Sequence, residues 1–359
     1  MSESSESRLS RIVTAAESHF GKPVVKTSAP GGDGRSSFRI HFKDQSVIAT
    51  LRPNFRRTHL EAHALEQISA HCDDVPRMLG VVGEILFQSD VGRKRLNVEI
   101  ARVEGSERQH MAENAVAGIF RFQNAARATD LHTFLPNLGS NGEWYENFIN
   151  AATALQPYGP GVGKDFDGQA VYERLAVPMT QFIKWDCRSG NAAIGADGKL
   201  RWFDFEYCGV RHGAEDIAWL IGDEAWPLEP DAMVDVVIDA FDPSCGHSLE
   251  EYFRYLSTYV TLHCIQRFKL ILKEEAKRGW LNKDRVRKYD DAGVHPEFAA
   301  HICKVGAYFA AQDKLTLPLR DAFEAAMVNF QYVTVQEARR EAREAARLLK
   351  KKRRPVLRV

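Results

Sequence analysis

Apolar and polar residues alternate along several short stretches of the first hundred residues. The segment Phe38-Arg39-Ile40-His41-Phe42 alternates with the period of a β-strand. By the same criterion we expect strands at 24–26, 38–42, 46–52, 84–88 and 96–103. Between them, apolar residues recur at helical spacing in 58–69, which predicts a helix. The first part of the chain, residues 1–104, therefore mixes strand and helix.

From about Gly105 onward the spacing of apolar residues is mostly helical. Residues 110–132 and the aromatic-rich region 227–332 show this pattern clearly. We therefore expect an α+β protein of two lobes: a small β-rich lobe at 1–104 and a larger, mainly helical lobe at 105–336. A basic helix or tail follows at 337–359.

One hairpin signal interrupts the helical part. Ala192-Ala193-Ile194 is typical of a short strand, residues 196–199 contain an Asp-Gly turn, and residues 200–203 return antiparallel. Because a hairpin brings its two ends together, Asn191 and Asp204 should lie side by side. Asp186, in the loop just upstream, can face both of them.

These three side chains suit phosphoryl transfer from a metal-bound nucleotide. The Asp186 carboxylate can accept a proton from an alcohol. The amide oxygen of Asn191 and the carboxylate of Asp204 are hard ligands of the kind that Mg²⁺ prefers. The alternative for such a triplet is that each side chain bonds nearby backbone and simply forms a turn.

Two motifs around this hairpin resemble a known family. The first is D-C-R-S-G-N at 186–191, and the second is F-D-F-E-Y at 203–207, followed by E-D-I-A at 215–218. Together they resemble the catalytic and metal-binding motifs of the aminoglycoside phosphotransferase and choline/ethanolamine kinase superfamily, with D-F-E-Y most similar to the choline-kinase side. That superfamily has the protein-kinase-like fold.

The resemblance implies an ATP-dependent small-molecule kinase that uses Mg²⁺. In it, Asp186 would be the catalytic base, Asn191 and Asp204 the metal ligands, and Asp216 a buried support of the catalytic loop. Arg188 lies where related kinases often place a cation, which could neutralise charge on the transferred phosphoryl group. The alternative for Arg188 is an ordinary surface arginine.

Two segments of the first lobe are candidates for nucleotide contact. The glycine-rich turn at 30–37 could lay backbone N–H groups over phosphates, with Ser36 as a lid residue, although such turns also occur in plain hairpins. The segment 98–105 resembles the hinge between lobes, where the backbone of Ala101 to Val103 would bond the adenine edge. An ordinary buried strand is the alternative there.

The family also places a phosphate-contacting cation on the strand at 46–52, paired with a glutamate of the next helix. Arg52 and Glu61 are the matching positions, and an arginine can bind phosphate through two N–H groups. The alternative is that they form a surface ion pair that contributes little to stability.

Lys184 is the main departure from the family pattern. The family usually has a histidine two residues before the catalytic aspartate, where it braces the loop. Lys184 leaves the proposed base in place but changes the hydrogen bonding of the loop. A nucleotide-binding pseudokinase that acts as a scaffold is therefore the alternative function.

The acceptor is predicted only as a class, a small-molecule alcohol. An amino alcohol, which D-F-E-Y favours, an aminoglycoside, or another metabolite alcohol all fit the motifs. Trp219, Asp223, Glu224 and Trp226 could form a cage for a quaternary amine, although aromatic residues at such spacing more often belong to the core.

Composition excludes several other classes of protein. The 359 residues contain equal numbers of basic and acidic side chains, which argues against a general nucleic-acid binder. The six cysteines form no C-x-x-C pair, as expected for reduced thiols. Because no apolar run reaches the ~18 residues that span a bilayer, we expect a cytoplasmic protein. Composition does not indicate an oligomeric state.

Charge is unevenly placed along the chain. Residues 337–359 hold ten Lys/Arg and three Asp/Glu, a net charge of +7, so the rest of the chain carries −7. This tail could contact an anionic membrane, nucleic acid or a second subunit. A solvated, frayed end is the alternative.

Overall fold

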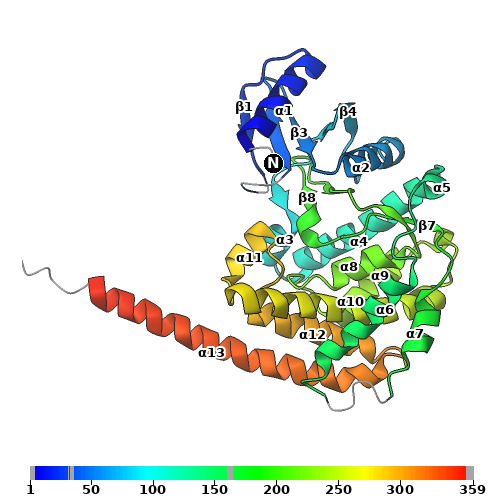
Figure 1. Ribbon diagram of the computed structural model, residues 1–359, viewed down its shortest axis with the longest axis vertical. Helices are drawn as coiled ribbons and strands as arrows, with labels where there is room; N and C mark the ends of the chain where they lie inside the picture. The colour runs from blue at the N-terminus through cyan, green and yellow to red at the C-terminus, as the bar shows by residue number, and fades with distance from the viewer. Residues whose placement is uncertain (1–4, 31, 33–35, 160–164, 353–359) are drawn as a thin grey trace, which may run out of the picture.

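The first part of the computed structural model is built on a five-stranded antiparallel sheet (Figure 1). The structure describes residues 5–30, 32, 36–159 and 165–352. The strands are β1 (Lys26–Ser28), β2 (Ser37–His41), β3 (Ser46–Leu51), β4 (Met78–Val82) and β5 (Ile85–Ser89), in the spatial order β1-β2-β3-β5-β4. The four strands expected before residue 90 are confirmed with small shifts at their ends, and β4 was not among them.

The two faces of this sheet differ in polarity because side chains alternate along each strand. Val47 and Ala49 of β3 point to an apolar face, where Ile12 and Ala16 of helix α1 (Ser5–Phe20) cover them. The opposite face is mostly polar and lines a cavity with Ser37, Arg39, Ile48, Arg52 and Gln88. The sheet therefore presents its polar face to the second lobe.

Helix α2 (Phe55–Ile68) confirms the helix predicted after β3. The side chain of Asn54 caps its first turn by accepting a hydrogen bond from the backbone N–H of Arg56. Leu65 and Ile68 pack into the core with Leu86 of β5. Packing on this side places Glu61, which is fully buried, next to the end of β3.

The strand predicted at 96–103 is wrong. These residues form helix α3 (Leu96–Glu99) and a 3₁₀ turn (Ile100–Arg102), directly after the short strand β6 (Lys94–Arg95). Leu96 and Ile100 are fully buried and lie one helical turn apart. Because spacing of four residues fits both a strand and a helix, the short alternation was ambiguous.

The predicted hairpin is present, and we call it the catalytic hairpin after the role that the sequence predicts for it. Strands β8 (Ala192–Ile194) and β9 (Leu200–Trp202) pair antiparallel, and β6 adds to them in the order β6-β8-β9. A second small sheet pairs β7 (Gln181–Ile183) with β10 (Gly209–Arg211), so the catalytic loop and the D-F-E-Y segment lie between two short antiparallel ladders.

The rest of the chain is helical and shares one large core with α2. Helix α10 is the longest buried element, and α12 and α8 pack beside it (Figure 1). The α-helices are α4 (Gly105–Arg127), α5 (Leu131–Phe134), α6 (Gly142–Asn150), α7 (Gly168–Leu175), α8 (Ala214–Ile221), α9 (Pro230–Ala240), α10 (Leu249–Arg278), α11 (Lys283–Tyr289), α12 (Pro296–Ala310) and α13 (Arg320–Lys352). The α+β organisation is thus confirmed.

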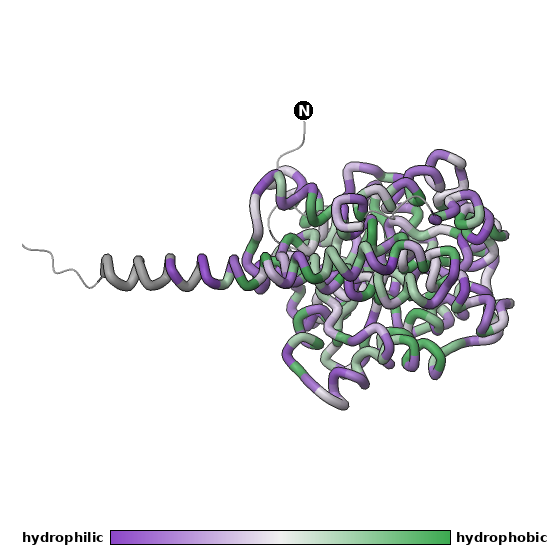
Figure 2. The backbone as a smooth tube through the Cα atoms, turned by 90° about the horizontal axis from the view of Figure 1, so that it is seen from below, coloured by the Kyte–Doolittle hydropathy of each residue, from purple (hydrophilic) through white to green (hydrophobic). Residues whose placement is uncertain are grey.

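Helix α13 starts against α12, and its C-terminal half extends away from the rest of the molecule (Figures 1 and 2). The predicted helix at the basic end is confirmed as far as Lys352, and residues 353–359 lie outside the described part. Within the described part, no helix is both long and apolar enough to cross a membrane. Contact of the tail with an anionic surface stays a prediction.

Candidate active site

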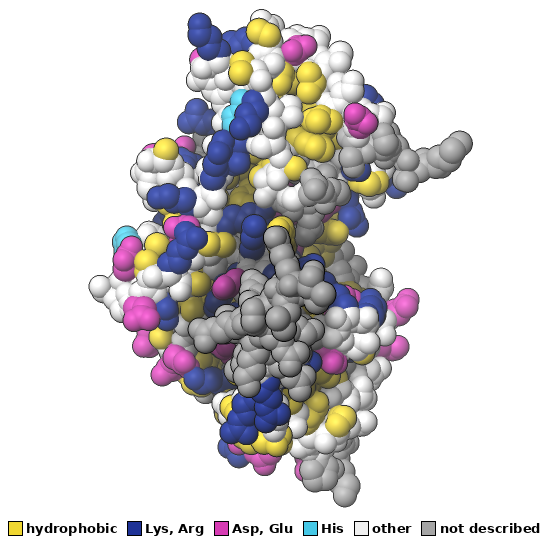
Figure 3. All heavy atoms as spheres, turned by 90° about the vertical axis from the view of Figure 1, so that its left-hand side faces the viewer, with side chains coloured by type: hydrophobic (Ala, Val, Ile, Leu, Met, Phe, Trp, Pro, Cys, Tyr) yellow, Lys and Arg dark blue, Asp and Glu magenta, His cyan; other side chains and the backbone are white. Residues whose placement is uncertain are grey.

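A cavity of about 910 Å³ lies between the polar face of the sheet and the catalytic hairpin. Among the described residues that line it, nine are Lys or Arg and seven are Asp or Glu. Figure 3 shows basic side chains gathered around the waist between the two parts of the molecule. A site with more cations than carboxylates suits a polyphosphate ligand.

Most of the predicted site residues meet at this cavity, and two do not. The lining includes Ser36, Arg52, Glu61, Asp186, Arg188, Asn191 and Asp204. Ala101 and Val103 are not part of it, although Arg102, between them in the chain, is. Of the glycine-rich turn, residues 31 and 33–35 lie outside the described part.

Asp186 is held by two neighbours within its own motif. Its Oδ1 accepts a hydrogen bond from Nε of Arg188 at 2.7 Å, and its Oδ2 accepts one from Nδ2 of Asn191 at 3.0 Å. Burial alone would raise the pKa of the Asp186 carboxyl, but the positive charge of Arg188 brings that pKa below its usual value. The carboxylate is therefore ionised at neutral pH, as a general base requires.

The backbone of this loop is unusual at three positions. Trp185 and Asp186 have φ values of 59° and 58°, and Asp204 has 67°, which is the left-handed region that non-glycine residues rarely adopt. Such conformations persist only where surrounding contacts enforce them, and they concentrate at functional sites. Here they turn both aspartate side chains toward the cavity.

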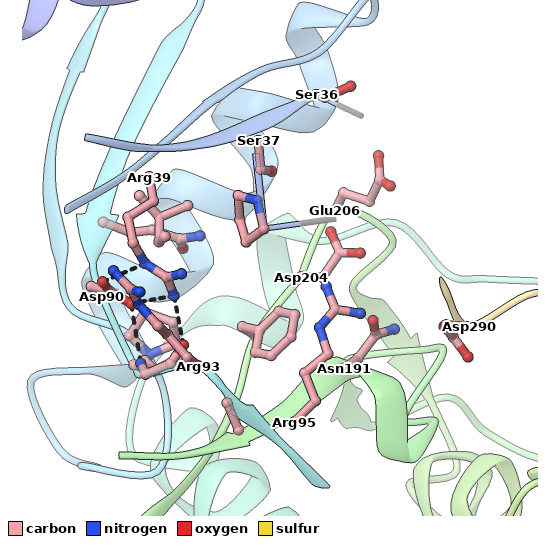
Figure 4. Close-up of a pocket in the computed structure, with 18 of the residues that line it drawn as sticks. Ser36, Ser37, Arg39, Asp90, Arg93, Arg95, Asn191, Asp204, Glu206 and Asp290 are labelled. Carbon is pink, nitrogen blue, oxygen red and sulfur yellow. Dashed lines mark hydrogen bonds and ion pairs between the residues drawn. The ribbon is translucent and has the colours of Figure 1, made fainter. Parts of the chain in front are cut away.

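Asn191 and Asp204 lie side by side, as the hairpin predicts. The backbone N–H of Phe203 donates to the carbonyl of Asn191 at 2.9 Å. Nδ2 of Asn191 donates to the carbonyl and to Oδ2 of Asp186, and the Asp204 side chain is 34% exposed. Figure 4 shows the Asn191 and Asp204 side chains close together, with Asp290 to their right in that view. Their oxygens can thus serve one cation.

Arg52 and Glu61 form the predicted ion pair, and the cluster is larger than expected. Arg52 bonds Glu61, Oδ1 of Asp204 at 2.5 Å and Oε2 of Glu206 at 2.9 Å. Burial alone would lower the pKa of Arg52, but the three carboxylates raise it above its usual value. Glu61 also accepts a hydrogen bond from the backbone N–H of Phe205 at 3.0 Å. Helix α2 is therefore tied to the D-F-E-Y segment, and Glu206 acts as an acceptor for Arg52.

Beneath the loop, Asp216 and Lys184 supply its internal support. Asp216 is buried and accepts the backbone N–H groups of Lys184 and Trp185, both at 2.8 Å. Lys184 is also buried, and its Nζ donates to the carbonyl of Asp186 at 3.2 Å. The ammonium thus braces the catalytic loop where the family has histidine. Burial raises the pKa of the Asp216 carboxyl to about 6.

The contact between the sheet and the segment after β5 was not predicted from the sequence. Arg39 is buried and binds Asp90 with Nε and Nη2 at 2.6 and 2.8 Å, and its Nη2 also donates to the carbonyl of Gly92. This segment, residues 89–92, lines the cavity at the end far from Asn191 (Figure 4). The end of a buried strand followed by Asp-Val-Gly was the available signal.

The proposed amine cage is wrong. Trp226 is buried and donates to the sulfur of Met233, while Asp223 accepts both N–H and O–H of Ser189. Glu224 makes a two-pronged ion pair with Arg267. Each of these three groups is thus engaged by a residue outside the proposed cage, and none of them lines the cavity.

The comparisons with solved structures agree with this fold. A spectinomycin phosphotransferase, APH(9)-Ia, in complex with ADP and spectinomycin, matches with a TM-score of 0.50 and 9% identity over 88% of this chain and 98% of that one. The aminoglycoside phosphotransferase APH(2")-IIa, in complex with gentamicin, matches with a TM-score of 0.50 and 8% identity over 85% and 99%. No protein-family model and no curated protein sequence matches the chain. The resemblance read from the motifs is confirmed at the level of the fold: the chain has the two-lobed, protein-kinase-like fold of these phosphotransferases.

Proposed function

We propose that this protein transfers the γ-phosphoryl group of ATP to a hydroxyl group of a small molecule. The observation that carries the proposal is the meeting of Asp186, Asn191 and Asp204 at one cavity lined by cations. Catalysis of phosphoryl transfer depends mostly on positioning the reactants and neutralising charge, and the residues that line this cavity can do both.

The nucleotide would lie along the polar face of the sheet. Its phosphates would face Arg52, which uses three of its five N–H groups on carboxylates and keeps two. Ser36 lines the same end, and the segment 89–92 borders the other end. The spectinomycin phosphotransferase matched above was solved with ADP, which supports a nucleotide as a ligand of this fold.

The residues present fit a Mg²⁺ ion. Asn191 and Asp204 offer an amide oxygen and a carboxylate on the same side of the cavity, and Mg²⁺ commonly takes one or two protein oxygens plus phosphates and water. No cluster of three His, Cys, Asp or Glu with metal-binding geometry occurs in the described part of the chain, so the protein alone does not form a complete cage. When bound, the ion would neutralise charge on the phosphates.

The chain's own groups would handle the proton and the transferred group. Asp186 would accept the proton of the acceptor hydroxyl through a carboxylate that Asn191 and Arg188 hold in place. Arg188 would stabilise negative charge on the phosphoryl oxygens. Lys184 and Asp216 would keep the loop in its left-handed conformation from below.

The test is turnover of ATP with a panel of amino alcohols, aminoglycosides and sugars, detected as phosphorylated acceptor by mass spectrometry. Asp186→Ala and Asp204→Ala should each reduce kcat by about 10²–10⁴-fold. Asp197→Asn is the matched control, because Asp197 lies in the turn of the same hairpin and pairs with Arg201 outside the cavity. Phosphorylation that survives both alanine substitutions would contradict the mechanism.

A pseudokinase scaffold remains the alternative. It predicts that ATP binds and that no member of the panel is phosphorylated. Lys184 was the reason to consider it, and the bracing contact of Lys184 removes that reason. The close contact between Arg52 and Asp204 favours the alternative, because a metal ion must share Asp204 with a cation.

A further inference from the structure

Arg188 contacts a second carboxylate that no sequence motif includes. Its Nη1 binds Oδ1 of Asp290 at 3.0 Å, while its Nε binds Asp186. Asp290 lies 102 residues further along the chain, immediately after helix α11. All three side chains line the cavity. One guanidinium is therefore shared between the proposed base and a distant aspartate.

The backbone around Asp290 is built to bring its carboxylate here. Asp290 ends α11 in the left-handed conformation, with φ 52° and ψ 52°. Its carboxylate lies directly against Gly190 of the catalytic loop, where an added Cβ would come within 2.8 Å of Cγ of Asp290. A glycine at position 190 thus permits a contact that any other residue would displace.

The segment that carries Asp290 is anchored on both sides. The side chain of Asn97 in α3 donates to the carbonyl of Arg287 at 2.8 Å. Asp291 binds Arg278 of α10 with both oxygens, and the buried Val294 accepts a hydrogen bond from Leu281 through its carbonyl. Residues 281–294 therefore form a braced strap across the catalytic loop, and we call this segment the α11 strap.

The two aspartates that bind Arg188 determine which of its N–H groups are available to a ligand. In the described part of the chain, Nε and Nη1 have carboxylate partners and Nη2 has none, although the side chain is only 15% exposed. Without Asp290, the guanidinium would be free to turn and bind both oxygens of Asp186, because two-pronged pairs are the favoured geometry. That rotation would turn more of the guanidinium onto the proposed base and leave less of it for a ligand in the cavity that Arg188 lines.

We propose that Asp290 is a positioning residue that holds Arg188 so that its Nη2 faces the γ-phosphoryl group of the bound nucleotide. This inference rests on the proposed function for the identity of the nucleotide. It assigns the α11 strap a role in the site: the strap completes the catalytic loop with a carboxylate that the motif itself lacks.

The test uses binding, so that it does not depend on finding the acceptor. Calorimetry on the full chain would compare MgADP with the non-hydrolysable ATP analogue MgAMPPNP, which carries the γ group. We expect Arg188→Ala and Asp290→Ala each to weaken AMPPNP by about ten-fold, the usual size of a lost charge-assisted hydrogen bond, and ADP much less. Asp284→Asn, an exposed aspartate on the same helix, should bind both nucleotides like the wild type.

The double variant separates positioning from general damage. If Asp290 acts through Arg188, Asp290→Ala should weaken AMPPNP no further once Arg188 is alanine. Asp290→Asn, which keeps an acceptor for Nη1, should recover part of the loss. Additive losses in the double variant, or equal weakening of ADP and AMPPNP, would overturn the inference.

The outcomes also distinguish this inference from the proposed function. Selective loss of AMPPNP affinity with no phosphorylated acceptor in any panel would support the positioning role and contradict the phosphotransferase. Turnover by the wild type together with an unchanged AMPPNP affinity in Asp290→Ala would support the phosphotransferase and contradict the positioning role. A circular-dichroism melt of each variant shows whether it is folded, and Asp290→Asn serves in place of any alanine variant that is not.

Discussion

Two arginines face the cavity, one from the sheet and one from the catalytic loop, and each is shared between carboxylates. Arg52 binds Glu61, Asp204 and Glu206, and its side chain is 8% exposed. Arg188 is bound to two aspartates that are about one-fifth exposed. The first cluster ties a strand, a helix and the D-F-E-Y segment together. The second engages Nε and Nη1 of its guanidinium but, among the described residues, gives Nη2 no carboxylate partner. Similar chemistry thus serves structure on one wall and, as we propose, ligand contact on the other.

The largest difference between the two clusters should appear in stability. Arg52→Met leaves Glu61 fully buried without its cation, which costs about 3–5 kcal/mol of unfolding free energy. Arg188→Met leaves two aspartates that keep some contact with water, so its cost should be smaller than that of Arg52→Met. Urea unfolding of the two variants measures both values.

A matched variant checks the reason for that difference. Glu61→Gln combined with Arg52→Met removes the buried charge as well as its partner, so the double variant should regain much of the lost stability. Equal destabilisation by the two arginine substitutions would contradict the comparison, as would a double variant no more stable than Arg52→Met alone.

The two clusters also differ in how far sequence could predict them. Arg52 and Glu61 lie nine residues apart on a strand and the following helix, and Asp204 is placed by a hairpin turn, so local patterns sufficed. Asp290 reaches Arg188 because Asn97 of α3 holds the end of α11 and Arg278 of α10 binds Asp291, and no local period encodes those contacts. The strand expected at 96–103 failed for a related reason: a five-residue alternation does not distinguish the two periods, and the buried Leu96 and Ile100 chose the helix.

Asp186, on the cavity side of the catalytic loop, and Asp216, on its buried side, should make stability depend on pH in opposite directions. The pKa of Asp216 is raised by burial from 3.8 to about 6, so the folded state disfavours its ionised form. Its stabilising contribution is complete below pH 3.8 and is lost as pH rises toward 6. The pKa of Asp186 is lowered by Arg188 despite burial, so its contribution is present above pH 3.8 and is lost in acid.

The Asp216→Asn variant should reveal the direction in which ionisation of Asp216 changes stability. Between pH 4 and pH 6.5, the unfolding free energy of the wild type should fall by up to about 3 kcal/mol relative to the variant. Asp223→Asn should change in the same direction, because burial also raises the pKa of Asp223 to about 6. Urea unfolding across this pH range measures the difference. If the unfolding free energies of the wild type and Asp216→Asn changed with pH in the same way, ionisation of Asp216 would not destabilise the folded state and the prediction would be wrong.

Lys184 allows the support beneath the loop to be compared with the two clusters above it. Lys184→Met keeps the volume but removes one of the two donors to the carbonyl of Asp186, the other being Nδ2 of Asn191, which should cost about 1 kcal/mol. Because that carbonyl belongs to the proposed base, kcat should fall more than KM rises. Lys184→His restores a donor of the kind found in the family, and it should recover part of kcat. Loss of nucleotide affinity without loss of kcat would place Lys184 outside the catalytic loop's support.

The smallest effect is expected at the rim of the Arg52 cluster. Arg57 approaches Oε2 of Glu206 at 3.6 Å and lies over the ring of Tyr207 at 4.3 Å, and its side chain is 42% exposed. Exposed pairs of this kind contribute less than about 1 kcal/mol, so Arg57→Ala should scarcely change the urea midpoint. Its effect on MgATP affinity should be visible mainly at low salt, because an exposed cation at the mouth of the cavity attracts phosphate at long range. Calorimetry at two ionic strengths decides the matter: a loss of affinity that persists at high salt would mean that Arg57 contacts the phosphates directly and belongs with Arg188.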